Sequence, residues 1–213
     1  MPPALTAPGG GATIALVPAA RRFSQAISEG DGISVIVAVG GPEDALRAEG
    51  DGAEAVLVSS GSEGKLSGIR DATSLPILFD WDGERPDTLE GADACVVEAG
   101  GEREREWLER VHGELGDRFE LALRIHDEDH LEAALEHFDP ELFVLAAPDE
   151  EGDVALERVL DLLPDVPAGK LAIAELPGSG PEQVAELERA GVDAVIVGAT
   201  NAAELVGGAP PAL

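Results

Sequence analysis

Short apolar runs of strand length recur along this chain and alternate with segments of helical character. The runs are rich in Val, Ile, Leu and Ala, which is typical of strands buried on both faces. Eight such strands are predicted, at residues 33–39, 54–58, 76–80, 94–97, 120–125, 142–146, 171–174 and 194–197. Helical patterns lie between several of them, notably at residues 42–49, 102–115, 127–138 and 154–163.

The stretch 170–204 shows this alternation most clearly. A short apolar strand at 171–174 ends in a cluster of Pro and Gly residues, and a helix is predicted to begin at Pro181, which suits a first helical turn. Gly191 is expected to close that helix before the next buried strand begins. A strand, a helix and a second strand in this order form a unit of a parallel sheet.

Eight strands alternating with helices predict a compact (βα)8 barrel of the α/β class. The main alternative is an open doubly wound sheet, which normally has fewer strands and a G-x-G-x-x-G turn after the first one. This chain has Gly40, Gly41 and Pro42 at that place instead. The predicted barrel occupies about 170 residues against roughly 250 in a typical member. Helices after the second, third and eighth strands are therefore expected to be shortened or missing.

The composition fits one globular domain. The chain has 213 residues, of which 44% are hydrophobic, and this is enough to fill a single core. We expect a flexible N-terminal segment over residues 1–20, one barrel domain over 21–206 and a short tail over 207–213. The single Cys95 lies within an apolar run, which favours a packing role over reactivity.

Charge is the unusual global property of the chain. It has 14 Lys and Arg residues against 43 Asp and Glu residues, a formal net charge of −29. A field of this sign repels nucleic acid and anionic membranes, so neither is an expected partner. No apolar run has the length of a membrane span, and no basic segment precedes an apolar one as in a signal peptide. The expected compartment is the cytoplasm, while the oligomeric state stays open.

The same charge predicts a dependence of stability on salt. Repulsion among the acidic groups disfavours the compact state, and the Debye length falls from about 10 Å at 0.1 M to about 3 Å at 1 M salt. We expect the melting temperature to rise as NaCl is increased over this range, as measured by circular dichroism. A flat or falling melting temperature would show that local ion pairs outweigh the net repulsion.

Several motifs resemble the indole-3-glycerol phosphate synthase family of (βα)8 barrels, which acts in tryptophan biosynthesis. The motifs are SQAISEGDGISVIVAV, GADACVV, ELALRIHDEDHLEAAL, GKLAIAE and PEQVAELERAGVDAVIVG. The resemblance implies a carbon–carbon lyase that decarboxylates and dehydrates a phosphorylated, ribulose-linked anthranilate. In that family Lys and Glu side chains at the strand ends act as general acids and bases.

Most residues that this chemistry needs are replaced in this chain. The family's catalytic and substrate-binding positions fall on Ile36, Ala38, Phe79, Arg124, Ala146 and Leu176. Only one catalytic residue of the family is retained, Glu175. Losing one catalytic acid or base costs about 10²–10⁴-fold in rate. The resemblance therefore predicts a synthase-like barrel that has lost the family's activity.

Two other functions stay open: a non-catalytic barrel with a structural or phosphate-ligand-binding role, and an enzyme that acts on a different small phosphorylated substrate. Barrels of this kind bind phosphate with the loops after strands seven and eight. The predicted phosphate-binding residues are Gly178, Ser179, Gly180, Gly198, Ala199 and Thr200. Glycines let the backbone approach an anion closely, and hydroxyl groups donate hydrogen bonds to it. The expected partner is a small phosphorylated molecule or inorganic phosphate.

Other polar residues are expected at the carboxyl ends of the strands. Asp80, Trp81 and Arg124 are predicted to line the pocket there, and Arg124 would form an ion pair with Asp80 or Glu175. His126 has a second histidine four residues later on the same helix face, but the order HDEDH differs from the H-E-x-x-H pattern of zinc enzymes. A solvated helix start is favoured there, and neither a metal site nor a cofactor is predicted.

Overall fold

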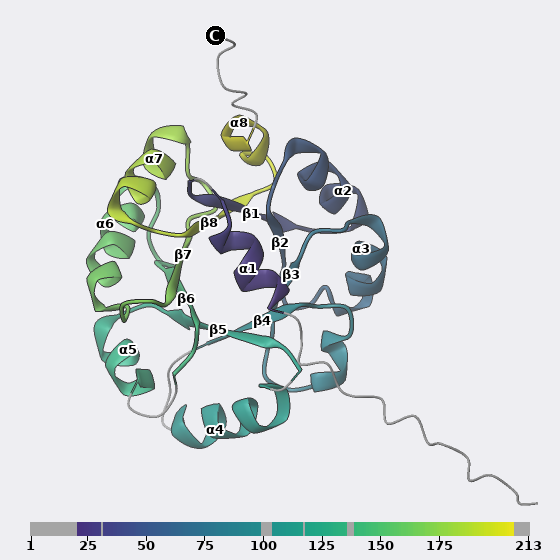
Figure 1. Ribbon diagram of the computed structural model, residues 1–213, viewed down its shortest axis with the longest axis horizontal. Helices are drawn as coiled ribbons and strands as arrows, with labels where there is room; N and C mark the ends of the chain where they lie inside the picture. Colours follow the sequence, from purple (N-terminus) through teal and green to yellow (C-terminus); the bar gives the residue numbers. More distant parts are fainter. Residues whose placement is uncertain (1–20, 31, 99–103, 117, 136–138, 207–213) are drawn as a thin grey trace, which may run out of the picture.

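Eight parallel strands close into a barrel in the order β1 to β8, with β1 also paired to β8. This computed structural model describes residues 21–30, 32–98, 104–116, 118–135 and 139–206. The strands are β1 (Ser34–Val39), β2 (Ala55–Val58), β3 (Ile77–Asp80), β4 (Ala94–Glu98), β5 (Glu120–Ile125), β6 (Leu142–Ala146), β7 (Leu171–Glu175) and β8 (Ala194–Gly198). Figure 1 shows the helices as a ring around these strands. The predicted compact (βα)8 barrel is confirmed.

The helices of the ring differ widely in length. The longer ones are α2 (Pro42–Asp51), α4 (Glu104–Leu115), α5 (Glu128–Leu135), α6 (Gly152–Leu162) and α7 (Pro181–Ala190). The short ones are α3 (Leu66–Ala72) and α8 (Ala202–Val206), with 3₁₀ turns η1 (Glu63–Lys65), η2 (Pro86–Leu89) and η3 (Leu163–Asp165). The expected shortening after strands two, three and eight is thus confirmed, and β3 is followed by η2 instead of an α-helix.

Parts of the sequence-based prediction lie outside the described residues. These are the N-terminal segment 1–20, the tail 207–213, and the predicted ends of two helices at 102–103 and 136–138. Within the described ranges, no helix is both long and apolar enough to cross a membrane.

The core has two layers because side chains alternate along each strand. Outward-pointing side chains pack against the helices, and inward-pointing ones fill the barrel. The strand residues of the inner layer are Ile36, Ala55, Leu57, Leu78, Ala94, Val96, Ala122, Leu142, Val144, Ile173, Ala194 and Ile196. The barrel interior is therefore a packed core, and polar inward positions are confined to the ends of the strands.

Helix α1 (Arg22–Ser28) closes the amino end of the barrel and crosses its centre in Figure 1. Phe23 and Ile27 are buried in the inner layer of the core. The carboxylate of Glu120 accepts hydrogen bonds from the backbone N–H groups of Phe23, at 2.8 Å, and Ser24, at 3.1 Å. A carboxylate satisfies the free N–H groups of a helix start well. This end of the barrel is therefore sealed, which leaves the carboxyl end for a site.

A short motif of Gly, any residue, an acid and Ala is repeated before β2, β4 and β8. Gly52, Gly91 and Gly191 have φ values of 99°, 102° and 94°, a region that favours glycine. Each acid accepts a 2.8 Å hydrogen bond from the backbone N–H of a residue in a neighbouring strand: Glu54 from Val35, Asp93 from Ile77 and Asp193 from Ala172. The motif thus fixes the starts of strands at the amino end of the barrel.

Cys95 lies on the outer face of β4 and is fully buried. Burial raises the pKa of its thiol to about 12. The thiolate fraction near neutral pH is then lower than that of a free cysteine by roughly 10³-fold. We expect native protein to react with a disulfide reagent such as DTNB more slowly by at least this factor, and to react fully once unfolded in urea. Fast labelling of the native protein would contradict this.

Candidate functional site

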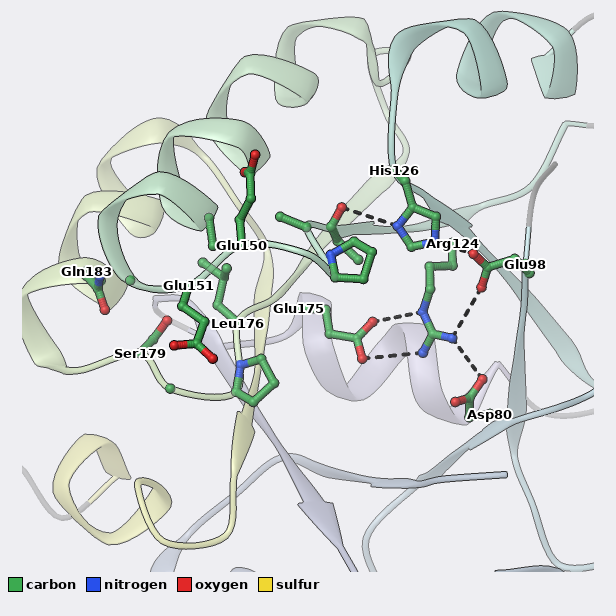
Figure 2. Close-up of a pocket in the computed structure, with 17 residues that line it drawn as sticks. Asp80, Glu98, Arg124, His126, Glu150, Glu151, Glu175, Leu176, Ser179 and Gln183 are labelled. Carbon is green, nitrogen blue, oxygen red and sulfur yellow. Dashed lines mark hydrogen bonds and ion pairs between the residues drawn. The ribbon is translucent and has the colours of Figure 1, made fainter. Parts of the chain in front are cut away.

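A cavity of about 820 Å³ opens at the carboxyl ends of the strands, mainly around β5, β6 and β7 (Figure 2). This volume lies within the roughly 300–1,000 Å³ range of small-molecule sites, and enzymes of this fold place their active sites at this end. One wall is apolar and includes Ala146, Ala155 and Leu176. The polar lining comprises Asp80, Glu98, Arg124, His126, Glu150, Glu151, Glu175, Ser179 and Gln183.

Arg124 lies at the centre of a cluster of charged side chains. Its Nε atom is 2.8 Å from Glu175 Oε2, and its Nη1 atom is 2.9 Å from Asp80 Oδ1 and 3.6 Å from Glu98 Oε2. Burial alone would lower the pKa of Arg124, but the charges of Glu175, Asp80 and Glu98 outweigh that effect and raise it. The guanidinium therefore stays charged and holds three carboxylates in place.

Strand geometry explains why these residues meet. Arg124 is two residues beyond Ala122, which points into the barrel, and two residues is the period of a strand. Glu98 is the direct neighbour of Arg124 in the register of β4 and β5. Glu175 stands two residues beyond the inward-pointing Ile173 in β7. The charged side chains thus form the last inward layer of the barrel, above an apolar interior.

His126 follows β5 and contacts the same cluster. Its Nε2 atom forms a close contact with Glu98 Oε1, and its Nδ1 atom is 3.4 Å from the carbonyl oxygen of Ala146. The guanidinium of Arg158 donates a 3.2 Å hydrogen bond to the backbone oxygen of His126. Both ring nitrogens therefore face oxygen acceptors, which fixes the ring in the cavity wall.

The loop after β7 contributes two of the predicted phosphate-binding residues to the cavity, Gly178 and Ser179. The backbone N–H of Ser179 donates to the Leu176 carbonyl at 3.1 Å, and that of Gly180 donates to Gln183 Oε1 at 3.3 Å. These two N–H groups are therefore used within the loop and in the start of α7.

The loop after β8 lies apart from the cavity. Gly198, Ala199 and Thr200 are not among the residues that line it. The Gly198 N–H donates a 2.9 Å hydrogen bond to the Pro177 carbonyl, which ties the two loops together, and the Thr200 hydroxyl donates to Asn201 Oδ1 at 2.9 Å. The structure therefore does not bring all six predicted phosphate-binding residues around one point.

Trp81 does not line the cavity, although Asp80 and Arg124 do. It is buried in the layer between strands and helices, where its indole N–H donates to the Arg85 carbonyl at 3.3 Å. The prediction placed Trp81 in the pocket because it follows a strand end. Side chains alternate across a strand, so the residue after the inward-pointing Asp80 turns outward.

Among the polar lining residues, Glu150, Glu151 and Gln183 were not expected at the strand ends. The first two lie between β6 and α6, in an acidic segment that is typical of a solvated loop. Their position directly after a predicted strand could have indicated a place in the site, because the loops after the strands build the sites of this fold. Within the described ranges, no group of three or more His, Cys, Asp or Glu residues is arranged to hold a metal ion.

Two proteins of known structure illustrate which barrels this chain resembles in fold. One is a thiamine phosphate pyrophosphorylase from Pyrococcus furiosus, with a TM-score of 0.62, 14% identity, and coverage of 81% of this chain and 93% of that chain. Another is a putative phosphonomutase from Burkholderia cenocepacia, with a TM-score of 0.59, 18% identity, and coverage of 84% and 92%. Identities this low show the fold alone. No protein-family model matches the chain.

The predicted membership of the indole-3-glycerol phosphate synthase family is wrong. No family model matches, and the similar structures are barrels with other names. Two of the five motifs behind the resemblance, GADACVV and the GVDAVIVG end of the last one, contain the Gly-x-acid-Ala motif that fixes strand starts in this barrel. These motifs therefore reflect the fold. A lyase activity in tryptophan biosynthesis is therefore not supported, and a catalytic role of Glu175 stays a prediction.

Proposed function

We propose that this chain binds a small molecule in the cavity at the carboxyl ends of β5, β6 and β7. One observation carries the proposal: a cavity of about 820 Å³, with an apolar wall and a fixed set of charged groups, lies at the end of the barrel where this fold places its sites. The amino end is sealed by α1, and the barrel interior is filled by apolar side chains.

The contacts in the cavity support binding better than acid–base catalysis. Both carboxylate oxygens of Glu175 accept hydrogen bonds from Arg124, at 2.8 Å and 3.4 Å. Asp80 is bonded to the same guanidinium at 2.9 Å. Carboxylates held in this way form a rigid, charged floor on which a ligand can be positioned.

A blocked cavity tests this proposal. Ala147 lies in the loop after β6 and lines the cavity, so Ala147→Trp places an indole in the ligand's space. Leu46 is 61% exposed on α2 and does not line the cavity, so Leu46→Trp is a matched control. Thermal unfolding is measured with a library of small metabolites. We expect compounds that raise the melting temperature of the natural chain and of Leu46→Trp to lose this effect on Ala147→Trp. Equal effects on all three proteins would contradict the proposal.

A phosphorylated ligand is a second, narrower candidate. Gly178 and Ser179 line the cavity just before the start of α7, and the Ser179 hydroxyl can donate a hydrogen bond to a phosphate oxygen. The two proteins of similar fold are named a thiamine phosphate pyrophosphorylase and a phosphonomutase. The phosphate group would contact Gly178 and the Ser179 hydroxyl instead of the loop after β8.

A phosphate titration followed by amide NMR tests this second candidate. We expect millimolar phosphate to shift the amide signals of Gly178 and Ser179, and Ser179→Ala to reduce the affinity by about three- to tenfold because one hydroxyl donor is lost. Thr200→Ala is the control and should leave the affinity unchanged. Shifts centred on Thr200, or no localised shifts, would contradict a phosphate site at Ser179.

A further inference from the structure

The charge of the cavity narrows the class of ligand that it suits. Among the lining residues, five are carboxylates and one is a guanidinium, so the net charge is −4 with His126 neutral. Arg124 is already paired with three of the carboxylates, Asp80, Glu98 and Glu175. The other two, Glu150 and Glu151, have no ion-pair partner within the described ranges.

Helix starts reduce this negative charge only in part. Helix α6 begins at Gly152, and helix α7 begins at Pro181 next to the lining residue Gln183. Each helix start contributes a partial charge of about +0.5. The cavity therefore remains at about −3, and it favours a cation over an anion.

Ser179 is an independent indication that a ligand completes this cavity. The residue is only 3% exposed and lines the cavity. Its backbone N–H and C=O are bonded to Leu176 and Asn201, but no residue in the described part of the chain is bonded to its hydroxyl. The hydroxyl reaches the surface of the cavity and is free to take a hydrogen-bond partner there. A ligand in the cavity would supply that partner.

We infer that the ligand carries a cationic group, an amine or a guanidinium, which binds beside Glu151 and Ser179, where the nearby charge of Glu150 adds to the attraction. Figure 2 shows Glu151 close to Ser179 on one side of the cavity, the carboxylate of Glu150 pointing away from them, and Arg124 with its carboxylates on the other side. An ammonium group donates hydrogen bonds to carboxylates and to the oxygen of a hydroxyl group. The apolar residues Leu176 and Ala155 would contact the hydrocarbon part of the same ligand.

This inference rests on the proposed binding function, and it holds for a phosphorylated ligand as well. A phosphate group adds a charge of about −1.5 to −2 to a cavity that is already negative. The one guanidinium in the lining is paired by carboxylates. A phosphorylated ligand would therefore need a cationic group of its own to balance the site.

Three simple probes test the inference by amide NMR at low salt and pH 7: 1,4-diaminobutane, the neutral 1,4-butanediol and inorganic phosphate. We expect saturable shifts with the diamine, centred on the amides of Gly152, Gly178 and Ser179, and weaker or no shifts with the diol. The double variant Glu150→Gln/Glu151→Gln should bind the diamine about tenfold more weakly, since two nearby charges are lost. The matched control Glu157→Gln/Asp161→Asn removes two exposed charges from α6, the helix that follows Glu151, and should change the affinity less than about twofold.

The outcomes separate this inference from the proposed function. Binding of the diol or phosphate in the cavity without binding of the diamine would overturn the cationic inference and leave the cavity as the binding site. Equal loss of diamine affinity in both double variants would show general attraction to an acidic surface, which also overturns it. If the diamine fails while Ala147→Trp still abolishes stabilisation by library compounds, the inference fails and the proposed function stands.

Discussion

Replacing Arg124 with methionine is expected to lower the free energy of unfolding by about 3–5 kcal/mol at pH 7, the usual effect of removing one partner from a buried ion pair. The Arg124 side chain is 11% exposed, and those of Asp80 and Glu175 are 24% and 21% exposed. Without the guanidinium, these carboxylates face one another with little solvent between them. Glu98 is more exposed, at 54%, and contributes less because water screens it.

Urea unfolding followed by circular dichroism measures this effect. Arg47→Met is the control, because Arg47 is 60% exposed and pairs with Asp44 on the surface of α2. Its loss should cost no more than about 1 kcal/mol. Similar values for the two variants would contradict the conclusion that Arg124 holds the site together.

The second large effect is expected at the opposite end of the barrel. Phe23→Ala should lower the free energy of unfolding by about 3–5 kcal/mol, the range for truncating a buried phenylalanine. Phe23 is fully buried and packs into the inner layer of the barrel core. Its removal leaves a cavity in the inner layer of the core, which the closed strands cannot fill by moving together.

The control for this variant is Leu46→Ala on the exposed face of α2, where the change should stay within about 0.5 kcal/mol. A loss below about 1 kcal/mol for Phe23→Ala, measured by the same urea unfolding, would show that α1 is not part of the cooperative core.

Most of the fold was predictable because buried strands leave a direct signal in the sequence. The strands at 120–125 and 142–146 were predicted with the bounds that the structure has, and the others differ by one residue at an end. The short helices were predicted from chain length, since too few residues separate the strands after β2 and β3 to form full helices.

The residues of the site were predictable only where they lie at the end of a strand, because the alternation of side chains then decides which of them point inward. The pairing of Arg124 with Asp80 and Glu175 was expected, since all three end strands at the same face. The hydrogen bond from Gly198 to Pro177 was not expected, because it joins two loops that lie far apart in the sequence. Glu150 and Glu151 were missed because an acidic segment in a chain of charge −29 is most simply read as solvated surface.

Part of the resemblance to the synthase family came from residues that fix the strands and do not reach the cavity. The motif residues Asp93 and Asp193 bond to neighbouring strands at the amino end of the barrel, far along the strands from the cavity. A similarity based on such residues reports how strands are fixed, and it carries no information on the residues that line the cavity.

Crystals soaked with a set of small amines, phosphates and neutral alcohols would show directly whether ligands bind in the cavity at the carboxyl ends of β5, β6 and β7. We expect bound compounds to gather in the cavity beside Glu151 and Ser179, with amines the most frequent among them. Compounds bound repeatedly at another surface, with none in the cavity, would contradict this expectation.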